Sequence, residues 1–239
     1  MKRLLIVVAI AALFAVNANA VTIADLQAGH GGGTWTISET MDYWTASDLT
    51  TGVNGNSKFE IVLEQAGYES TFGLYDVNTD GSIKSTYTLF ELGNEVGDTS
   101  HVNFWNDNGN WSITTSYSNN GDDTDDNWFA FSSTFGFFYG IDEDYKSETD
   151  GHTVDYTVFT DNSLNTGGQA GIEHIKTGYE SNWSELYIFL DDQRGSNRDY
   201  DYTDMTVSTN DVAPVPEPAT LLLLGSGLVG LAFLKRRKS

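Results

Sequence analysis

The stretch "STFGLYDVNTDGSIKSTYTLFEL", residues 70–92, carries the clearest fold signal of the chain. Two runs in it, residues 70–77 and 85–92, alternate apolar and polar side chains with a period of two, which favours half-buried β-strands. Asp80 and Gly81 lie between the runs, and Asp-Gly is a preferred dipeptide of tight hairpin turns. The stretch therefore predicts two antiparallel strands joined by a hairpin.

The same alternation recurs along the chain, in runs rich in Thr, Tyr, Phe, Val and Ile, which suit a pleated and half-buried surface. Segments rich in Gly, Asn and Asp separate these runs, as expected for turns, and no helical period of useful length lies among them. The pattern predicts an all-β fold at residues 21–208, an antiparallel two-sheet sandwich with a jelly-roll-like arrangement. The further runs cover residues 34–39, 58–64, 101–105, 111–117, 128–140, 153–160, 185–191 and 204–208.

The composition is acidic and aromatic. The 239-residue chain has 12 Lys and Arg residues against 34 Asp and Glu residues, so its formal net charge is −22 at pH 7. This charge excludes nucleic acid as a partner, because phosphate binding needs a basic surface, whereas it attracts divalent cations such as calcium. Aromatic residues make up 13% of the chain and cysteine is absent, so we expect a packed core without disulfides.

Residues 1–20 have the layout of a secretory signal peptide. Two cations precede an apolar run at residues 4–16, and Ala18-Asn19-Ala20 provides a small-x-small cleavage site. The apolar run is shorter than the ~20 residues that a membrane-spanning helix needs. We therefore expect a signal helix that is removed on export, with the mature protein beginning near Val21.

A second apolar segment, residues 219–234, carries no charged residue along its length. As a helix it would rise about 24 Å, slightly less than the ~30 Å hydrocarbon core of a bilayer. The tail that follows, residues 235–239, has the basic cluster of a stop-transfer signal that stays on the cytoplasmic side. The pattern predicts a transmembrane helix after a linker at residues 209–218. The basic cluster consists of Lys235, Arg236, Arg237 and Lys238.

The linker contains Val215-Pro216-Glu217-Pro218 directly before the apolar segment. A proline on each side of Glu217 favours a stiff, extended backbone in this motif. This motif, the Leu- and Gly-rich span and the basic cluster together resemble the PEP-CTERM sorting signal of Gram-negative bacteria. The resemblance implies recognition by an exosortase, a membrane protease or transpeptidase, with cleavage near the motif and release or transfer to the cell surface or extracellular matrix. A permanent membrane anchor is the alternative interpretation.

Residues 190–207, "LDDQRGSNRDYDYTDMTV", form the densest group of candidate ligands. On an extended strand Asp199 and Asp201 share one face, because side chains alternate with a period of two. Carboxylate oxygens that converge at a strand and a loop suit calcium better than zinc or copper. The stretch predicts a calcium site, with a solvated acidic hairpin as the alternative. The candidate ligands are Asp191, Asp192, Asp199, Asp201 and Asp204.

Residues 132–207 also resemble an uncharacterised bacterial extracellular domain that recurs in secreted, often PEP-CTERM-tagged proteins. The resemblance rests on the order of "FFYG", "FTDNSLNTGG", "EHI", "LYIFLDD" and "DYDYTDM", which closes on an Asp-x-Asp-aromatic-x-Asp signature. It implies a β-rich surface domain without assigned catalysis, in which the same five aspartates bind metal or organise the loop. Thr203 stands where Asn is usual and Asp191 where Glu is usual, and neither change removes an oxygen ligand.

Asp76, Asn78 and Asp80 offer a second calcium prediction, since their spacing matches the first positions of an EF-hand loop. Position 12 of such a loop is Tyr87, which lacks the bidentate carboxylate, and no flanking helix is predicted. A hairpin turn without metal is the alternative.

The sequence shows no motif of nucleophilic or zinc catalysis. Its four histidines have no pair at ligand spacing, and Gly-x-Ser-x-Gly, His-Glu-x-x-His and phosphate-loop motifs are absent. Glycoside hydrolysis needs only two carboxylates, so the acidic composition leaves it open. Four tryptophans lie beside Asn or Asp, where they can stack on sugars or fill the core: Trp105, Trp111, Trp128 and Trp183.

These observations favour a non-enzymatic exported protein that an exosortase sorts to the cell surface or to the matrix of a biofilm. The expected role is structural or adhesive, in association with extracellular polysaccharide and with calcium as a stabilising ion. Two other classes stay open. One is a secreted carbohydrate-binding module or glycan-active enzyme, and the other is a protein permanently anchored in the inner membrane.

Overall fold

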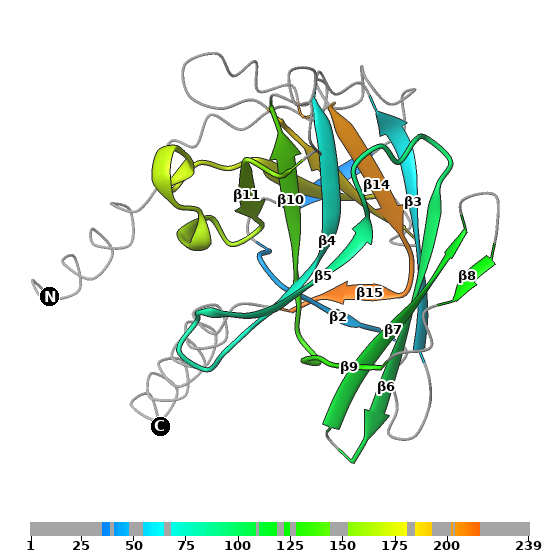
Figure 1. Cartoon of the computed structure of the whole chain (residues 1–239). Helices are drawn as coiled ribbons and strands as arrows, with labels where there is room; N and C mark the ends of the chain where they lie inside the picture. The colour runs from blue at the N-terminus through cyan, green and yellow to red at the C-terminus, as the bar shows by residue number, and fades with distance from the viewer. Residues whose placement is uncertain are drawn as a thin grey trace, which may run out of the picture.

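The computed structural model describes most of the predicted sandwich region (Figure 1). The signal peptide, Pro216-Glu217-Pro218, the predicted transmembrane segment and the basic cluster lie outside the described residues. Within them, no helix is both long and apolar enough to cross a membrane. The described residues are 35–38, 41–47, 55–64, 68–108, 110–118, 122–124, 128–143, 153–180, 185–192, 202 and 204–215.

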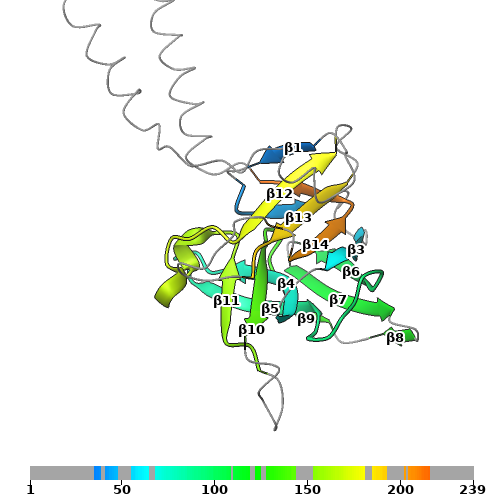
Figure 2. The same cartoon turned by 90° about the horizontal axis from the view of Figure 1, so that it is seen from above.

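Antiparallel sheets make up the protein, and the predicted all-β sandwich is confirmed (Figure 2). Among the described residues, the larger sheet has nine strands in the order β1-β12-β13-β14-β3-β6-β7-β8, and β9 pairs with β7 outside this path. Its strands are β1 (Trp35–Ser38), β3 (Gly55–Glu64), β6 (Thr99–Asp107), β7 (Asn110–Ser118), β8 (Asp122–Thr124), β9 (Phe129–Ala130), β12 (Ile175–Glu180), β13 (Leu186–Leu190) and β14 (Met205–Thr209).

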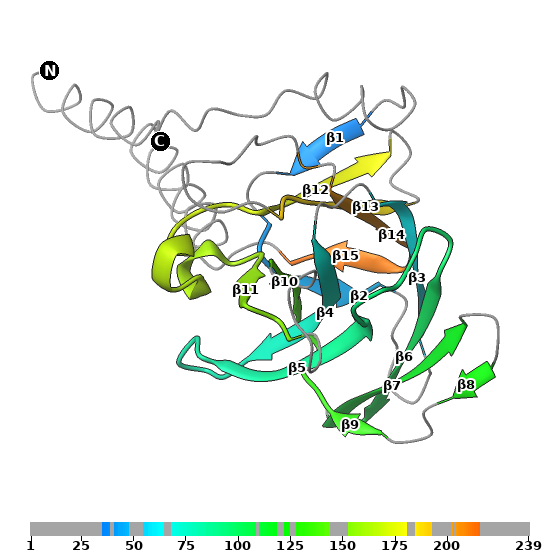
Figure 3. The ribbon, with the colours of Figure 1, turned by 45° about the horizontal axis from the view of Figure 1, so that its top comes forward.

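The smaller sheet has the order β11-β10-β4-β5, so β5 is an edge strand of the described sheet. A two-stranded ribbon of β2 and β15 completes the fold, and Trp44 of β2 exchanges backbone hydrogen bonds of 2.7 and 2.9 Å with Phe135, next to β10 (Figure 3). The elements are β2 (Trp44–Ala46), β4 (Glu69–Val77), β5 (Ile83–Phe90), β10 (Gly136–Asp142), β11 (Tyr156–Phe159), β15 (Val212–Pro214) and the 3₁₀ turns η1 (Asn162–Leu164) and η2 (Gly167–Gln169).

Aromatic rings fill the space between the sheets. Trp44, Phe59, Phe72 and Phe137 have no exposed surface. The ring centroids of Trp44 and Phe137 lie 4.6 Å apart, and those of Phe72 and Phe137 lie 5.8 Å apart. Full burial of a side chain of this size contributes about 1.5–3 kcal/mol relative to exposure. The aromatic content thus forms a core that joins strands of both sheets and the ribbon.

Residues 70–92 form the predicted hairpin, in which β4 and β5 pair antiparallel. The turn closes through a hydrogen bond of 2.8 Å from the Asn78 N–H to the Ser82 carbonyl. Gly81 has a φ of 84°, a left-handed conformation that glycine adopts at no steric cost. Asp80 Oδ1 accepts hydrogen bonds from the backbone N–H and the hydroxyl of Ser82, at 3.0 and 2.6 Å.

Gly73 lets the edge strand β5 approach β4 closely. A Cβ atom at this position would lie 2.2 Å from the carbonyl oxygen of Tyr87 and 2.5 Å from the ring of Phe138. The strand register also shifts between Phe72 and Gly73, as in a β-bulge. The absence of a side chain at Gly73 therefore helps to set the position of Tyr87.

The alternating run at residues 128–140 does not form one strand. It divides into β9, which pairs with β7 of the larger sheet, and the start of β10, which pairs with β4 of the smaller sheet. Phe135 lies in the connection and bonds to Trp44 of the ribbon. Alternation gives no sign that a chain crosses from one sheet to another within a single run.

The folded region extends past the predicted boundary at residue 208. Strand β15 pairs with β2, with Pro214 opposite Trp44, and the Val215 N–H donates a hydrogen bond of 2.9 Å to the Tyr43 carbonyl. Residues 209–215 of the predicted linker therefore belong to the folded region. Both ribbon strands have three residues, which is too short for a period-two signal.

Candidate functional site

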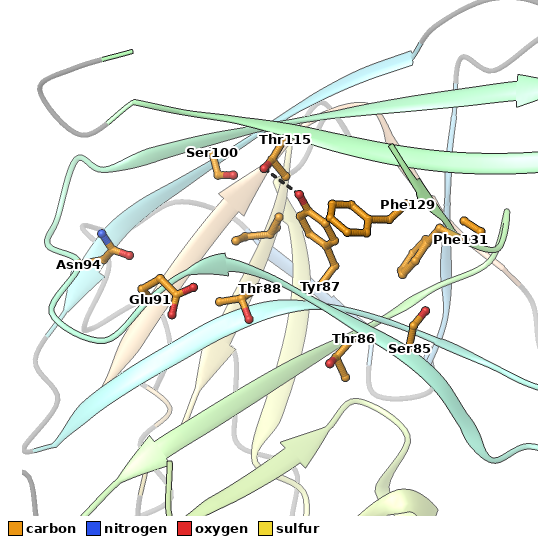
Figure 4. A pocket seen from close by; sticks show the side chains of 12 residues that line it. Ser85, Thr86, Tyr87, Thr88, Glu91, Asn94, Ser100, Thr115, Phe129 and Phe131 are labelled. Atoms are coloured by element: carbon orange, nitrogen blue, oxygen red, sulfur yellow. Dashed lines mark hydrogen bonds between the residues drawn. The ribbon is translucent and has the colours of Figure 1, made fainter. Parts of the chain in front are cut away.

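A groove of about 720 Å³ opens between the edge strand β5 and the strands β7 and β9 (Figure 4). Ligand sites of small molecules typically enclose about 300–1,000 Å³. Hydroxyl and aromatic side chains dominate the lining, which consists of Ser85, Thr86, Tyr87, Thr88, Leu89, Glu91, Asn94, Ser100, Thr115, Phe129, Ala130 and Phe131.

Tyr87 reaches across the groove from β5. Its hydroxyl lies 3.0 Å from Thr115 Oγ1 on β7, and its ring meets the ring of Phe129 edge-on with the centroids 5.3 Å apart (Figure 4). Phe129 is 45% exposed, whereas Leu89 and Phe131 are almost fully buried. The groove therefore combines an apolar base with an accessible aromatic ring.

Glu91 and Asn94 lie after β5, at the end of the groove away from the Phe129 and Phe131 rings (Figure 4). The Asn94 N–H donates a hydrogen bond of 3.3 Å to the Glu91 carbonyl, and Asn94 Nδ2 donates one of 3.0 Å to Asp98 Oδ2. These bonds hold the side-chain amide of Asn94 beside the carboxylate of Asp98. Glu91 is the only charged residue among the described residues that line the groove.

Asp76 ties β5 to β4 beside the groove. Its buried carboxylate accepts hydrogen bonds from Lys84 Nζ at 2.8 Å, from Ser132 Oγ at 2.9 Å and from the Ser85 hydroxyl. Burial raises the pKa of Asp76, but these hydrogen bonds outweigh burial and the resulting pKa lies below its usual value. Asp76 therefore stays ionised at neutral pH and its oxygens bond to β5 and to the segment before β10.

Negative charge gathers near the Glu91 end of the groove. Burial, followed by repulsion from Glu95, Asp98 and Glu69, raises the pKa of Glu64 at the end of β3. Asp98 is the same residue that accepts the hydrogen bond of Asn94. The acidic cluster of Glu64, Glu69, Glu95 and Asp98 therefore adjoins the groove.

Asp191, Asp192 and Asp204 lie together at the ends of β13 and β14, and all three are buried. Asp204 Oδ2 accepts a hydrogen bond of 2.6 Å from the Asp192 N–H, and the Asp192 carbonyl accepts one of 2.6 Å from the Tyr156 hydroxyl. The Asp191 N–H donates to the His174 carbonyl at 3.0 Å. The three aspartates thus connect β13 and β14 to β11 and to the segment before β12.

Tyr202, the aromatic residue of the Asp-x-Asp-aromatic-x-Asp signature, has an unusual backbone conformation. Its φ is 55°, which is a strained value for a bulky residue, and its side chain is buried. The Tyr202 hydroxyl donates to the Glu173 carbonyl at 3.2 Å, and Lys176 Nζ lies 5.3 Å from the ring centroid. These contacts hold the chain just before Asp204 in place.

The predicted calcium ligands are only partly described. Asp199 and Asp201 lie outside the described residues. In the part of the chain that the structure describes, no group of three or more His, Asp or Glu side chains is placed to hold a metal ion. Metal binding by the Asp191 group, and by Asp76, Asn78 and Asp80 in the β4–β5 hairpin, therefore stays a prediction.

Sequence reasoning missed the groove, because it considered tryptophans as the sugar-stacking residues. Trp105 and Trp111 are half-buried and Trp128 is 48% exposed, but none of these three lines the groove. Trp183 lies outside the described residues, and the tryptophan of the core is Trp44. The polar alternation of β5 indicates an accessible face, but nothing in the sequence shows that β5 is an edge strand beside β9.

Comparison with known proteins identifies the tail. Residues 214–238 match the family model of the PEP-CTERM protein-sorting motif. No significant match was found among curated proteins or among solved structures. The motif implies exosortase-dependent export and surface localisation. The match covers residues 214–238 alone and shows that the chain carries a PEP-CTERM sorting motif there.

Proposed function

We propose that this exported protein associates with extracellular polysaccharide through the groove between β5, β7 and β9, in a structural or adhesive role. The groove itself is the observation that supports this function. Its accessible Phe129 ring and the ring of Tyr87 offer apolar faces for sugar rings, and its hydroxyls offer donors and acceptors for sugar hydroxyl groups. Glu91 and Asn94 add acceptor oxygens at one end.

We further propose that the groove binds sugars without cleaving them. Hydrolysis of a glycosidic bond uses two carboxylates about 5 to 10 Å apart. The described lining of the groove offers one carboxylate, Glu91. This arrangement favours a binding site over a glycoside hydrolase site, which is the second candidate function.

Sorting by the exosortase precedes this function in our proposal. The segment 219–234 holds the newly exported chain in the inner membrane of a Gram-negative bacterium, and processing near Pro216-Glu217-Pro218 transfers the folded region to the cell surface or matrix. Detection of the intact tail in the surface protein would instead support a permanent anchor.

Calcium stabilises the folded protein in our proposal. The buried carboxylates of Asp191, Asp192 and Asp204, the acidic cluster at Glu64 and the net charge of −22 support this role. A divalent cation offsets such repulsion locally, and carboxylate oxygens are the ligands that calcium prefers.

The test of polysaccharide association compares two aromatic substitutions on neighbouring residues. The full-length chain in mild detergent is screened against a panel of polysaccharides by calorimetry, together with Phe129→Ala and Trp128→Ala. We expect Phe129→Ala to weaken binding about tenfold, because an aromatic contact is worth about 0.5–1.5 kcal/mol, and Trp128→Ala to leave it nearly unchanged. Equal loss in both variants, or no binding to any glycan, would contradict the proposal. Release of sugar during incubation would support the hydrolase instead.

A further inference from the structure

The described charges that line or adjoin the Glu91 end of the groove are negative. Glu91 is the only charged side chain in its described lining, and the acidic cluster of Glu64, Glu69, Glu95 and Asp98 adjoins it through the Asn94–Asp98 hydrogen bond. Burial, followed by repulsion from the other members of this cluster, raises the pKa of Glu64. A ligand in the groove therefore meets a negative potential at the Glu91 end.

Within the described ranges, the lysines that could balance this potential are already paired. The lysines in the described ranges are Lys58, Lys84 and Lys176, and each forms an ion pair with a carboxylate. Lys84, on β5 itself, lies 2.8 Å from Asp76 Oδ2 on β4. The chain as a whole has 34 acidic against 12 basic residues, so the wider field reinforces the local one.

We propose that the groove selects uncharged glycans and rejects polysaccharides that carry carboxylate, sulfate or phosphate groups. The inference rests on the proposed function, because it names the class of sugar that the same site takes. Tyr87 and Phe129 contact the apolar faces of the sugar rings, and Glu91 with Asn94 accepts hydrogen bonds from hydroxyl or N-acetyl groups at one end. An anionic substituent near Glu91 is repelled, since like charges brought together at an interface disfavour the wrong partner.

The test uses pairs of glycans in which one member carries added carboxymethyl groups and therefore a negative charge. Each neutral oligosaccharide that binds the full-length chain is compared with its carboxymethylated form, in buffer with a chelator so that no divalent cation bridges the two anions. At about 0.01 M salt, where the Debye length is ~30 Å, we expect the neutral form to bind at least tenfold more tightly. At about 1 M salt, where the Debye length is ~3 Å, we expect this preference to shrink while the neutral form keeps its affinity.

Glu91→Gln supplies the local test, because glutamine keeps the size and an acceptor oxygen of the side chain. We expect it to raise affinity for the carboxymethylated form by about fivefold, the effect of one like-charge contact at 4 Å in water. The neutral form should bind up to about fivefold more weakly, because an amide oxygen accepts a weaker hydrogen bond than a carboxylate, so the affinities of the two forms should change in opposite directions. Glu185→Gln is the matched control, since Glu185 precedes β13 and lies in a separate polar pocket.

The outcomes separate the two proposals. Binding of the carboxymethylated form as tightly as the neutral form at low salt would overturn the charge selection and leave polysaccharide association intact. An affinity change in Glu185→Gln equal to that in Glu91→Gln would overturn the local role of Glu91. Absence of binding to every glycan would overturn both proposals.

Discussion

The hydroxyl of Tyr87 lies 3.0 Å from Thr115 Oγ1, so a side chain of the smaller sheet bonds to the larger sheet across the groove. This bond joins the edge strand β5 to β7, which are not paired through their backbones. The groove is therefore bounded by two strands that one side-chain hydrogen bond connects.

We predict that Tyr87→Phe and Thr115→Val each lower the free energy of unfolding by about 0.5–1.5 kcal/mol, the typical net contribution of one hydrogen bond. The double variant should lose little more than either single variant, because both changes remove the same bond. Urea unfolding of the four proteins gives the coupling energy. Strictly additive losses would mean that the two hydroxyls do not interact.

An alanine at position 73 should displace β5 and so change the shape of the groove. Gly73→Ala places a Cβ atom where the Tyr87 carbonyl is 2.2 Å away, so β5 must shift. We expect a loss of about 1–3 kcal/mol or more in stability, together with weaker glycan binding. Gly168→Ala is the control, since no heavy atom lies within 4 Å of its added Cβ and we expect a change within about 0.5 kcal/mol. Similar melting temperatures for both variants would refute this account.

Glu64→Gln should stabilise the protein in a pH-dependent way. The pKa of Glu64 is higher in the folded state than its usual value, so the folded state binds the proton more tightly than the unfolded state. The stability that this proton contributes is present below the unfolded pKa, near 4.3, and is lost as pH rises through the folded pKa.

The free energy of unfolding of Glu64→Gln should therefore equal that of the parent near pH 3.5. Near pH 7 it should be higher than that of the parent, by less than about 1 kcal/mol because solvent screens the charges. Thermal unfolding across this pH range measures the difference. A gain in stability that is constant with pH would show that it comes from packing rather than from removal of a charge disfavoured by burial and by repulsion.

Two substitutions of Asp204 separate a metal role from a loop role. Asp204→Asn keeps an oxygen that can accept the Asp192 N–H but removes the charge, whereas Asp204→Ala removes both. If calcium binds at Asp204, calcium should raise the melting temperature of the parent but not that of Asp204→Asn. In chelator, the two proteins should have the same melting temperature.

Asp204→Ala should lose stability in chelator as well, by about 1–3 kcal/mol, because a buried N–H is left without its acceptor. An undiminished response of Asp204→Asn to calcium would contradict metal binding at Asp204. The Asp80→Asn variant, in the exposed β4–β5 turn, applies the same comparison to the second predicted calcium position.

The sequence predicts the fold class well because its strongest signals are local. Period-two alternation and the Asp80-Gly81 turn mark β4 and β5 without any knowledge of their neighbours. Strand β12 escapes prediction, because buried Lys176 and Gly178 interrupt its apolar pattern, and the ribbon strands are too short to show one. Pairing between distant segments, such as β5 beside β9, is a long-range property that no local pattern encodes.

The sequence predicts the chemical character of the candidate site but not its position in the fold. Acidic composition and aromatic content indicate a protein suited to polysaccharide or cations, but they do not say which aromatic rings are accessible. Phe129 is accessible because the run at residues 128–140 divides between two sheets, and at this division Phe135 is fully buried and exchanges backbone hydrogen bonds with Trp44. The groove is thus a consequence of tertiary packing.

On the proposed sorting route, the pairing of β15 with β2 limits how far the folded region can stand from the membrane before processing. The last described hydrogen bond is from Val215, and four Cα steps separate Val215 from Ala219, where the predicted membrane segment begins. An extended chain covers at most ~3.6 Å per step, so this gap spans no more than about 14 Å. That clearance is smaller than the ~30 Å diameter of a small domain. On the proposed sorting route, an enzyme that acts at Pro216-Glu217-Pro218 therefore approaches from within the bilayer, and its cut frees the folded region from close confinement at the lipid surface.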